Sequence, residues 1–539
     1  MTRDLATNEA AQFTERVRAN QQKLTGNLQP QYDFIVCGSG TSGSVVAGRL
    51  AENSDVQVLL LEAGGGDDIA TITEAAMWPA NLGSERDWDF HAAPNRCLNG
   101  RTLSLSMGKV LGGGSSINAM IWARGHKTDW DFYADEVGDP AWNYESILKI
   151  YRRIENWRGK PDPAYRGSGG PVLVAPCAAP SPIALAVIDA AQSIGIAPFE
   201  NQNGRLMESD GGASITDLRV WAGKRQSVFR SYTFPRMAQA NLTVLTNALV
   251  TRLTFEGRRV SGVEFSYQGG THRILAGREV ILSLGAMHTP KLLMQSGLGD
   301  QEELRRFEIP VVQHLPGVGR NFQDHVGFDC VWESQTRSLS APAVQATFFL
   351  KTNPKLDRPN LQTFEGDFAK SSPENTAKFA LPENGWGLFG TIVSPKSRGR
   401  IRLTGRNPLD PIQIEANSLS HPDDLAAARM SVDLSREIGN SAILRPFTKR
   451  EVAPGNIKGA DLDNFIRDAT VTSWHETCTA KMGRGAQAVV NGALKVYGVD
   501  KLRIADGSVL PRITTGNTMA PCVIIGERAA EMLRAEHKL

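Results

Sequence analysis

The chain has 539 residues, of which 41% are hydrophobic and 22% charged, with 52 glycines and 28 prolines. This composition is typical of a loop-rich globular protein and excludes a fibrous or disordered one. Its 59 Lys and Arg nearly balance 57 Asp and Glu, for a net charge of +2, so no basic surplus points to nucleic acid or an anionic membrane surface. At this length we expect more than one domain.

The start of the chain carries no apolar stretch of the signal-peptide type, and no window of about 20 residues is apolar enough to span a bilayer. The six cysteines lie apart without CxxC pairs, which predicts reduced and mostly buried thiols. We therefore expect a cytoplasmic protein. Residues 4–24 predict a polar helix, so residues 1–29 are expected to be a helical appendage that docks on the body, with a mobile tail as the alternative.

The first chemical motif combines a strand, a tight turn and a helix. Ile35 and Val36 predict a buried strand, Gly38-x-Gly40-x-x-Gly43 the turn, and residues 45–50 the inner face of a helix. The glycines allow the sharp turn, the approach of backbone N–H groups to a pyrophosphate and the close packing of helix on strand, while the helix N-terminus faces the phosphates. The motif predicts a dinucleotide site.

An acidic residue follows at the expected offset. A second strand, residues 57–61, leads to Glu62, about 20 residues after Gly43, where a carboxylate accepts hydrogen bonds from ribose hydroxyls. The same carboxylate would repel a 2′-phosphate, which argues against NADP. NAD and FAD both remain open on these residues alone.

The rest of the chain alternates between two kinds of structure. The run Gly108–Asn118 is so rich in small residues that its backbone is expected to press against something bulky. Helical periodicity follows at residues 129–155 and a Gly/Pro-rich loop region at 161–182. Buried strands are predicted at 242–245, 249–255, 260–267, 279–283 and 502–505, aromatic antiparallel segments with a helix at 422–438 fill the region 324–468, and a final helix runs through residue 533.

These elements predict an α/β chain in which two discontinuous domains interleave. Residues 30–125, 226–325 and 470–539 are expected to form a Rossmann-like nucleotide-binding domain. Residues 126–225 and 326–469 are expected to form an α+β substrate domain with an antiparallel sheet.

Two long segments give the chain a family resemblance. The run Gly108–Asn118, continuing through Gly125, resembles the first signature of the glucose-methanol-choline (GMC) flavin oxidoreductases, and Gly285–Gly299 resembles the second. Shorter similarities occur at residues 315–325, 394–399 and 503–508. The resemblance covers nearly the whole chain, from Tyr32 to about Ala535.

The resemblance implies bound FAD, with adenine at the glycine turn and the isoalloxazine ring at the domain boundary. It implies that Glu62 holds the adenosine ribose, that Val250 contacts adenine and that Asp506 and Gly507 cap the pyrophosphate region. Together with the glycine motif, it predicts cofactor contacts from Gly38, Gly40, Thr41, Ser42, Gly43, Glu62, Ala63, Trp88, Gly108, Lys109, Leu111, Gly112, Gly113, Ser116, Asn118, Ala119, Met120, Val250, Gly285, Trp474, Asp506, Gly507, Asn517, Thr518 and Met519.

An alcohol hydroxyl is a weak acid, and hydride leaves more readily from an alkoxide, so a base near the flavin is required. Residues 472–483 resemble the family segment that carries this base, which assigns the role to His475, although Glu476 and Cys478 stand where the family usually has Pro and Gly. Asn517 is its expected partner, because an amide can hydrogen-bond the substrate oxygen without competing for the proton. The closing helix is expected to direct its positive end at the flavin.

These assignments imply oxidation of a primary alcohol, aromatic alcohols included, to the aldehyde: His475 removes the hydroxyl proton, hydride passes to flavin N5, and O2 or another acceptor reoxidises the flavin. A hydroxynitrile lyase without net redox, a choline-type dehydrogenase, a flavin-bound structural or sensor protein and a nicotinamide enzyme are the alternatives. No metal site is expected. The particular alcohol, the choice between oxidase and dehydrogenase, and the oligomeric state stay open.

Two further expectations concern the cofactor link and the substrate. Some family members attach FAD through a histidine at the position of Ile117, which has no nucleophilic nitrogen, so noncovalent FAD is predicted. Aromatic and acidic residues of the 324–468 region are candidate substrate walls, although core packing is the commoner role for such residues, and Glu365 could hold a cation such as choline. These candidates are Phe348, Phe349, Phe364, Glu365, Trp386 and Phe389.

Overall fold

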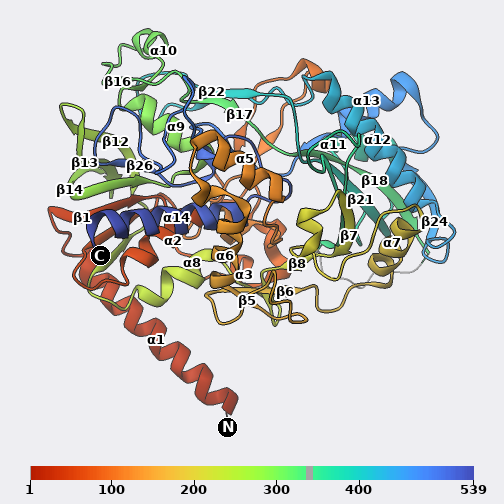
Figure 1. Cartoon of the computed structure of the whole chain (residues 1–539), viewed down its shortest axis with the longest axis horizontal. Coiled ribbons are helices and arrows are strands. Elements are labelled where there is room, and N and C mark those ends of the chain that lie inside the picture. Colours follow the sequence, from red (N-terminus) through yellow and green to blue (C-terminus); the bar gives the residue numbers. More distant parts are fainter. Residues whose placement is uncertain (1, 336–343) are drawn as a thin grey trace.

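Two seven-stranded sheets organise the chain, and Figure 1 shows them at opposite ends of the molecule. The computed structural model describes residues 2–335 and 344–539; residue 1 of the expected appendage and residues 336–343 of the expected substrate domain lie outside it. The α/β fold class predicted from the sequence, with a mainly parallel sheet and a separate antiparallel sheet, is confirmed.

The first sheet has a parallel core extended by an antiparallel meander. Its order is β11-β2-β1-β14-β13-β12, with β26 added parallel to β14. The parallel strands are buried on both faces, and residues 34–37 of β1 are fully buried, because helices cover both sides of such sheets. The strands are β1 (Gln31–Cys37), β2 (Val58–Leu61), β11 (Leu242–Leu245), β12 (Leu249–Glu256), β13 (Arg259–Tyr267), β14 (Gly270–Leu282) and β26 (Leu502–Ile504).

Two helices far apart in sequence pack together against this sheet. Helix α2 (Thr41–Leu50) follows the glycine turn, and α14 (Met519–His537) closes the chain. They touch closely at Gly526, where an added Cβ would lie 2.7 Å from Cβ of Val45. This contact brings the N-terminal ends of both helices to one region of the molecule (Figure 1).

The second sheet is antiparallel, in the order β24-β18-β21-β20-β19-β7, with β25 paired to β18. Helix α12 (Pro422–Gly439) covers one face so closely that a Cβ on Gly439 would lie 2.1 Å from the Trp332 ring. Helices α7 (Pro182–Ser193) and α13 (Gly459–Ala469) complete that layer. The strands are β7 (Gly211–Ile215), β18 (Val326–Ser334), β19 (Val344–Leu350), β20 (Leu361–Gly366), β21 (Gly385–Ile392), β24 (Thr448–Ala453) and β25 (Val471–Thr472).

The strand pairings support the proposed division into interleaved domains, which remains our proposal. Every strand of the parallel sheet falls in the segments assigned to nucleotide binding, and nearly every strand of the antiparallel sheet in the segments assigned to the substrate. The exception is β25, which belongs to the proposed nucleotide-binding segment 470–539 but pairs with β18. This pairing joins the two proposed domains immediately before His475.

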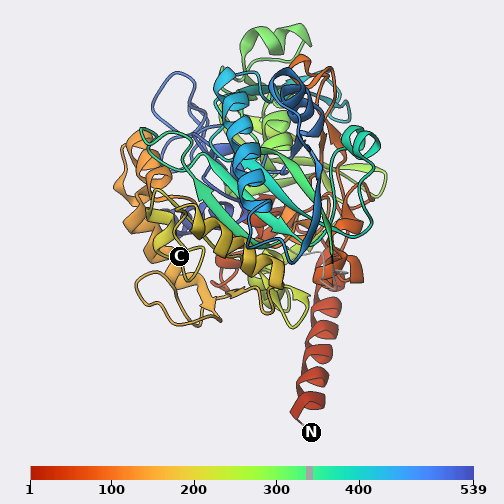
Figure 2. The same cartoon turned by 90° about the vertical axis from the view of Figure 1, so that its right-hand side faces the viewer.

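Two local expectations are refined by the structure. The helical region predicted at residues 129–155 is two helices, α5 (Lys127–Val137) and α6 (Tyr144–Ile154), because Gly138 adopts a left-handed conformation (φ 70°) that ends the first. Helix α1 (Thr2–Thr25) projects from the body (Figures 1 and 2), but its C-terminal half docks: the Gln21 amide donates to the carbonyl oxygens of Met237 and Leu242. In the described part of the chain, no helix is long and apolar enough to cross a membrane.

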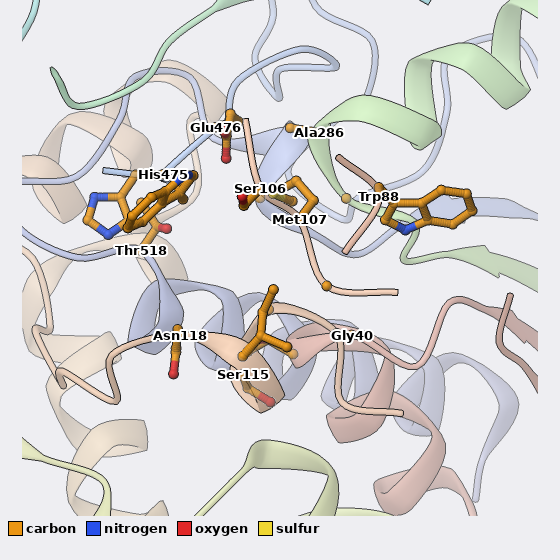
Figure 3. A pocket seen from close by; sticks show the side chains of 18 of the residues that line it. Gly40, Trp88, Ser106, Met107, Ser115, Asn118, Ala286, His475, Glu476 and Thr518 are labelled. Carbon is orange, nitrogen blue, oxygen red and sulfur yellow. The ribbon is translucent and has the colours of Figure 1, made fainter. Parts of the chain in front are cut away.

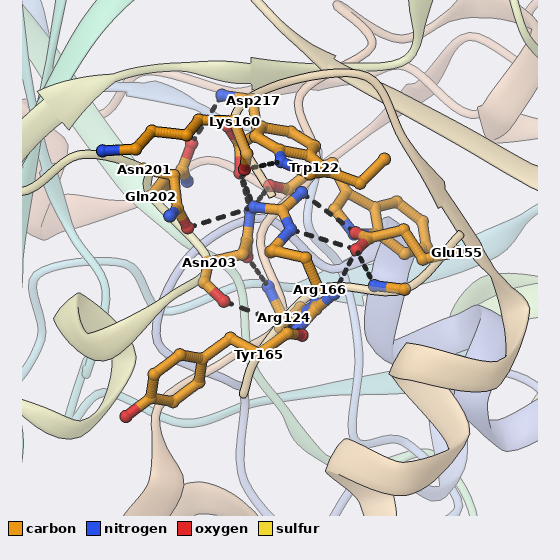
Figure 4. Close-up of polar contacts among 12 residues, drawn as sticks. Trp122, Arg124, Glu155, Lys160, Tyr165, Arg166, Asn201, Gln202, Asn203 and Asp217 are labelled. Atoms are coloured by element: carbon orange, nitrogen blue, oxygen red, sulfur yellow. Dashed lines mark hydrogen bonds and ion pairs between the residues drawn. The ribbon is translucent and has the colours of Figure 1, made fainter. Parts of the chain in front are cut away.

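A buried ionic cluster ties the loops beside α6 together (Figure 4). The Arg166 guanidinium lies between the carboxylates of Glu155 (3.0 Å) and Asp217 (2.6 Å), and Arg124 lies 2.7 Å from Glu155. All four side chains are at most 2% exposed. The hydrogen-bonded amide of Asn203 also donates to Asp217, so the buried charges are paired, as buried charges must be.

Candidate active site

One cavity of about 480 Å³ runs from the carboxyl ends of the parallel strands to the antiparallel sheet. This position outside the strand ends is where α/β sheets bind dinucleotides. Most of the predicted site residues line it: Gly38, Gly40, Thr41, Ser42, Glu62, Ala63, Trp88, Gly108, Gly113, Asn118, Ala119, Met120, Val250, Gly285, Trp474, His475, Asp506, Gly507, Asn517, Thr518 and Met519.

The other predicted cofactor contacts do not line the cavity: Gly43, Lys109, Leu111, Gly112 and Ser116. They support its wall instead. A Cβ on Gly43 would lie 1.9 Å from the carbonyl oxygen of Gly38, so this glycine serves helix-on-turn packing. The Ser116 hydroxyl donates to the carbonyl oxygen of Leu111 (2.6 Å), which holds the small-residue run in its folded shape.

The two glycine-rich segments touch back to back. A Cβ on Gly113 would lie 2.7 Å from Cα of Gly40, whereas a Cβ on Gly114 would meet nothing within 4 Å because it faces open space. The bulky neighbour expected for the Gly108–Asn118 run is therefore partly the first glycine turn. Only residues without a Cβ let both backbones reach the same wall of the cavity.

Glu62 closes the nucleotide end of the cavity. Its carboxylate accepts hydrogen bonds from the backbone N–H and hydroxyl of Ser39 (2.9 and 2.6 Å) and from the N–H of Gly64 (2.8 Å). Burial raises the pKa of Glu62, while these donors lower it. The side chain thus fixes the glycine turn and still presents its oxygens at the cavity, where the remaining lone pairs suit ribose hydroxyls.

At the other end, His475 lies between two partners from distant segments. Its Nε2 is 3.1 Å from the amide nitrogen of Asn517, and its Nδ1 is 3.0 Å from Nδ1 of His325. An amide nitrogen only donates, so in this orientation Nε2 accepts and Nδ1 carries the proton, which points at His325. The lone pair of Nε2 is held at the cavity wall.

Burial also sets the charge of His475. It lowers the pKa of this imidazole to about 3, because the charged form would lose its hydration. The ring is therefore neutral at physiological pH, which is the state that can accept a proton. His325, which is fully buried, has its pKa lowered by burial and by the neighbouring His475.

The backbone around His475 is held by Asp324. This carboxylate accepts from the N–H of His475 (2.9 Å) and from the hydroxyl of Thr472, which in turn accepts from the N–H of Trp474 (2.8 Å). Trp474 adopts a left-handed conformation (φ 57°), as does Cys478 (φ 74°) at the position where the resemblance expects glycine. Local strain of this kind persists only where surrounding contacts enforce it.

Helix α14 directs its N-terminus at the same end of the cavity. Asn517, Thr518 and Met519, which precede and open the helix, all line the wall. The unpaired N–H groups and the dipole of a helix N-terminus favour negative charge. The N-terminus of α2 lies at the nucleotide end of the cavity, so the cavity has two positions at which a helix N-terminus stabilises negative charge.

The cavity therefore fits a dinucleotide whose ring system reaches His475. Glycine backbones face its open space, and several polar atoms on its wall lack hydrogen-bond partners among the described residues: Oδ1 of Asn517, Nε1 of Trp474 and both carboxyl oxygens of Glu476. Buried polar groups normally have partners. A bound ligand would supply them.

The candidate substrate walls divide between the cavity and the core. Phe364 and Phe389 are register partners on β20 and β21, so they share a face, and both line the cavity, as does Glu365. Phe348, Phe349 and Trp386 do not line it. The Trp386 ring instead stacks on Trp332 with the centroids 4.6 Å apart, which is core packing.

Sequence reasoning missed several residues of the cavity wall. Asp329, on β18, shares a face with Phe389 and had no motif to mark it. His288 packs against Trp88 with centroids 4.1 Å apart, and its place inside the second signature was a usable signal. Glu476 was visible as a departure from the family pattern. Other missed wall residues are Trp78, Ser106, Met107, Lys291 and Lys370.

The chain is similar to known proteins over nearly its whole length. Family models for the N- and C-terminal parts of GMC oxidoreductases match residues 32–327 and 395–526. The chain is 35% identical to oxygen-dependent choline dehydrogenase 1 of Chromohalobacter salexigens, with 94% of this chain and 96% of the relative covered. It is 33% identical to human mitochondrial choline dehydrogenase, with 94% and 91% covered.

A solved structure shares the fold over nearly the whole length. Pyridoxine 4-oxidase from Mesorbium loti superposes with a TM-score of 0.89 at 29% identity, covering 94% of this chain and 99% of that one. The chain thus belongs to the GMC oxidoreductase family, whose members are FAD-dependent enzymes that act on CH–OH donors.

Proposed function

We propose that the chain oxidises a primary alcohol to the aldehyde with noncovalently bound FAD. The observation that carries the proposal is the placement of His475 and Asn517 together at the end of the cavity toward which α14 points. FAD, when bound, supplies the two-electron acceptor for the hydride of the carbinol carbon.

The residues of the chain supply the proton chemistry. In the proposed reaction the Asn517 amide N–H moves from Nε2 to the substrate oxygen, and the freed lone pair of Nε2 on the neutral His475 accepts the substrate hydroxyl proton. Nδ1 keeps its hydrogen bond to His325, which fixes the tautomer of His475. The N-terminus of α14 stabilises negative charge that develops beside it.

The similar proteins support an alcohol substrate, but their names give different alcohols. Choline dehydrogenases and a pyridoxine 4-oxidase are both similar to this chain. The aromatic wall of Phe364 and Phe389 suits an aromatic or other apolar alcohol. A hydroxynitrile lyase would use the same cavity without net oxidation, so reduction of the flavin by an alcohol separates the two activities.

The decisive experiment is an anaerobic screen of primary alcohols against the FAD-loaded protein. We expect bleaching of the flavin absorbance by the substrate, and admitting air then shows whether O2 is the acceptor. In His475→Ala, bleaching should slow by about 10²–10⁴-fold with FAD retained. The exposed His272 provides the control, His272→Ala. Bleaching at the native rate in His475→Ala would contradict the assignment.

A cationic alcohol of the choline type is the second candidate. Asp329 and Glu365 are buried acids on the cavity wall, which Phe364 and Phe389 also line. A bound cation favours the ionised form of a neighbouring acid, and aromatic rings recognise quaternary ammonium groups. Comparing choline with its uncharged isostere, in which carbon replaces the quaternary nitrogen, tests this. Faster flavin bleaching by the isostere than by choline would favour an uncharged alcohol as the substrate.

The prediction that FAD is bound noncovalently rests on Ile117, which lines the cavity and is 3% exposed. Its side chain has no atom that could bond to the flavin. Acid precipitation should leave the yellow colour in the supernatant, and colour in the pellet would refute the prediction. The cytoplasmic location also stays a prediction, which cell fractionation would check.

A further inference from the structure

Glu476 is a buried acid on the cavity wall that the proposed reaction does not use. It follows His475 directly, is 5% exposed, and lines the cavity. Figure 3 shows its carboxyl group pointing into the cavity, towards the side on which Ser115 and Asn118 lie. Both of its carboxyl oxygens are buried and have no hydrogen-bond partner within the described ranges.

The surroundings of Glu476 disfavour a negative charge. The nearby acids are Asp324 and Asp87, and no described basic side chain forms an ion pair with Glu476. Asp324 already accepts from the N–H of His475, and Asp87 from the N–H of Met107 (2.8 Å). Burial, followed by the charge of Asp324, raises the pKa of Glu476 well above its usual range, so the carboxyl group is neutral and has an O–H to donate.

The residue type at this position makes the arrangement informative. The family pattern usually has proline after the histidine, and proline would place no polar side chain here. A buried carboxyl group without a partner is costly, by about 1–3 kcal/mol, and Glu476 lies on the wall of a ligand cavity, so a bound ligand is the group that would satisfy it. Phosphate oxygens are poor candidates, since both helix N-termini already offer N–H groups for negative charge.

We propose that Glu476 donates a hydrogen bond, as a neutral carboxylic acid, to an acceptor atom of the bound flavin. The inference rests on FAD binding but not on alcohol turnover. A flavin gains negative charge on reduction, and a donor beside it binds the reduced form more tightly than the oxidised form. Glu476 should therefore raise the midpoint potential of the bound flavin.

The test compares Glu476→Gln with Glu476→Ala. Glutamine keeps the shape and a donor, whereas alanine removes both. The FAD-loaded proteins are reduced chemically against a reference dye, so that no alcohol substrate is needed, and the midpoint potential and the flavin absorption spectrum are recorded. A surface variant, Glu308→Gln, is the control, because Glu308 is 83% exposed.

We expect Glu476→Ala to lower the potential by about 30 mV, which is a tenfold loss in preference for the reduced flavin in a two-electron couple. Glu476→Gln should stay close to the native value, and the infrared band of a protonated carboxyl should be lost in both variants. If both variants raise the potential, Glu476 is ionised and the proposal is wrong. Native potentials in both would show that the carboxyl does not contact the flavin.

This readout separates the inference from the proposed activity. A protein that binds FAD and shows the expected shifts, yet is bleached by no alcohol, would overturn the proposed function and keep the role of Glu476. If Glu476→Ala fails to fold or to hold FAD, Glu476→Gln and the native infrared band still decide. If the infrared spectra of the native protein and Glu476→Gln show no difference in the protonated-carboxyl region, Glu476 is not protonated and the proposal is wrong.

Discussion

The amide nitrogen of Asn517 lies 3.1 Å from Nε2 of His475, although the two residues are 42 positions apart in the chain. The contact depends on β25, which pairs with β18 and leads into His475, and on α14, which begins just after Asn517. The base and its partner are therefore positioned by both sheets.

We expect Asn517→Asp to change the pH dependence of alcohol oxidation. A carboxylate within about 4–6 Å favours the charged imidazole, so it raises the pKa of His475 from about 3. The native enzyme should keep His475 neutral throughout the physiological range, while the variant should lose kcat/KM as the pH falls toward neutrality. The pH profile of kcat/KM reports these groups in the free enzyme.

Asn517→Ala is the matched control for this prediction. It removes the amide without adding charge, so kcat should fall by about 10²-fold with no new acidic limb in the profile. An unchanged profile in Asn517→Asp would contradict the role of Asn517 as the neighbour that sets the protonation of His475.

Gly43→Ala should abolish FAD binding or weaken it strongly, even though Gly43 does not line the cavity. The added Cβ would lie 1.9 Å from the carbonyl oxygen of Gly38, so the helix must move away from the turn that receives the pyrophosphate. The FAD content of the purified protein, read from its absorbance ratio, measures the effect.

Gly485→Ala gives the comparison for Gly43→Ala. A Cβ there meets nothing within 4 Å, and no unusual φ is imposed, so FAD content should stay at the native level. Native FAD content in Gly43→Ala would show that the turn tolerates a displaced helix.

Local motifs made the nucleotide end of the site predictable, whereas long-range contacts decided the rest. The spacing of Gly38, Gly40 and Glu62 needs only one strand, turn and helix, and all three line the cavity. The close approach of Gly113 to Gly40 depends on tertiary packing. Spacing could not distinguish glycines that face a ligand from those that face another backbone, as at Gly43.

The histidine pair shows the same limit. His475 was selected by its motif, but His325 had no evident chemical task in the sequence. Only the fold places its Nδ1 3.0 Å from the ring of His475. The departure at Glu476 was visible in the sequence, yet the absence of a partner for its carboxyl among the described residues is a property of the folded wall.

Asp329→Asn should remove a pH-dependent term from stability. Burial raises the pKa of Asp329 from 3.8 to about 7, so between these values the folded protein binds more protons than the unfolded chain. Stability contributed by this group is therefore present at low pH and is lost as the pH rises toward 7, with a slope of at most about 1.4 kcal/mol per pH unit.

The measurement is the melting temperature of the FAD-loaded protein between pH 5 and 7.5. The native protein should lose stability relative to Asp329→Asn as the pH rises through this window. Asp433→Asn, an exposed site on α12, should run parallel to the native protein. Parallel curves for Asp329→Asn as well would mean that Asp329 is ionised throughout.

Arg166→Met should destabilise the fold without emptying the cavity. The Arg166 side chain is 1% exposed, and its guanidinium pairs with Glu155 and Asp217. The guanidinium carbon Cζ lies 3.4 Å from the centroid of the Trp157 ring. Removing one member of a buried ionic cluster leaves uncompensated charge and costs about 3–5 kcal/mol. None of these residues lines the cavity, so protein that remains folded should keep its FAD spectrum.

The comparison is Arg18→Met, which removes an exposed pair with Glu15 in which both side chains are at least 64% exposed. Such pairs contribute about 0–1 kcal/mol, so its melting temperature should stay near the native value while that of Arg166→Met falls by several degrees. Equal melting temperatures for the two variants would mean that Arg124 alone neutralises Glu155 and that Asn203 suffices for Asp217. In that case the cluster would hold one more cation than the fold requires.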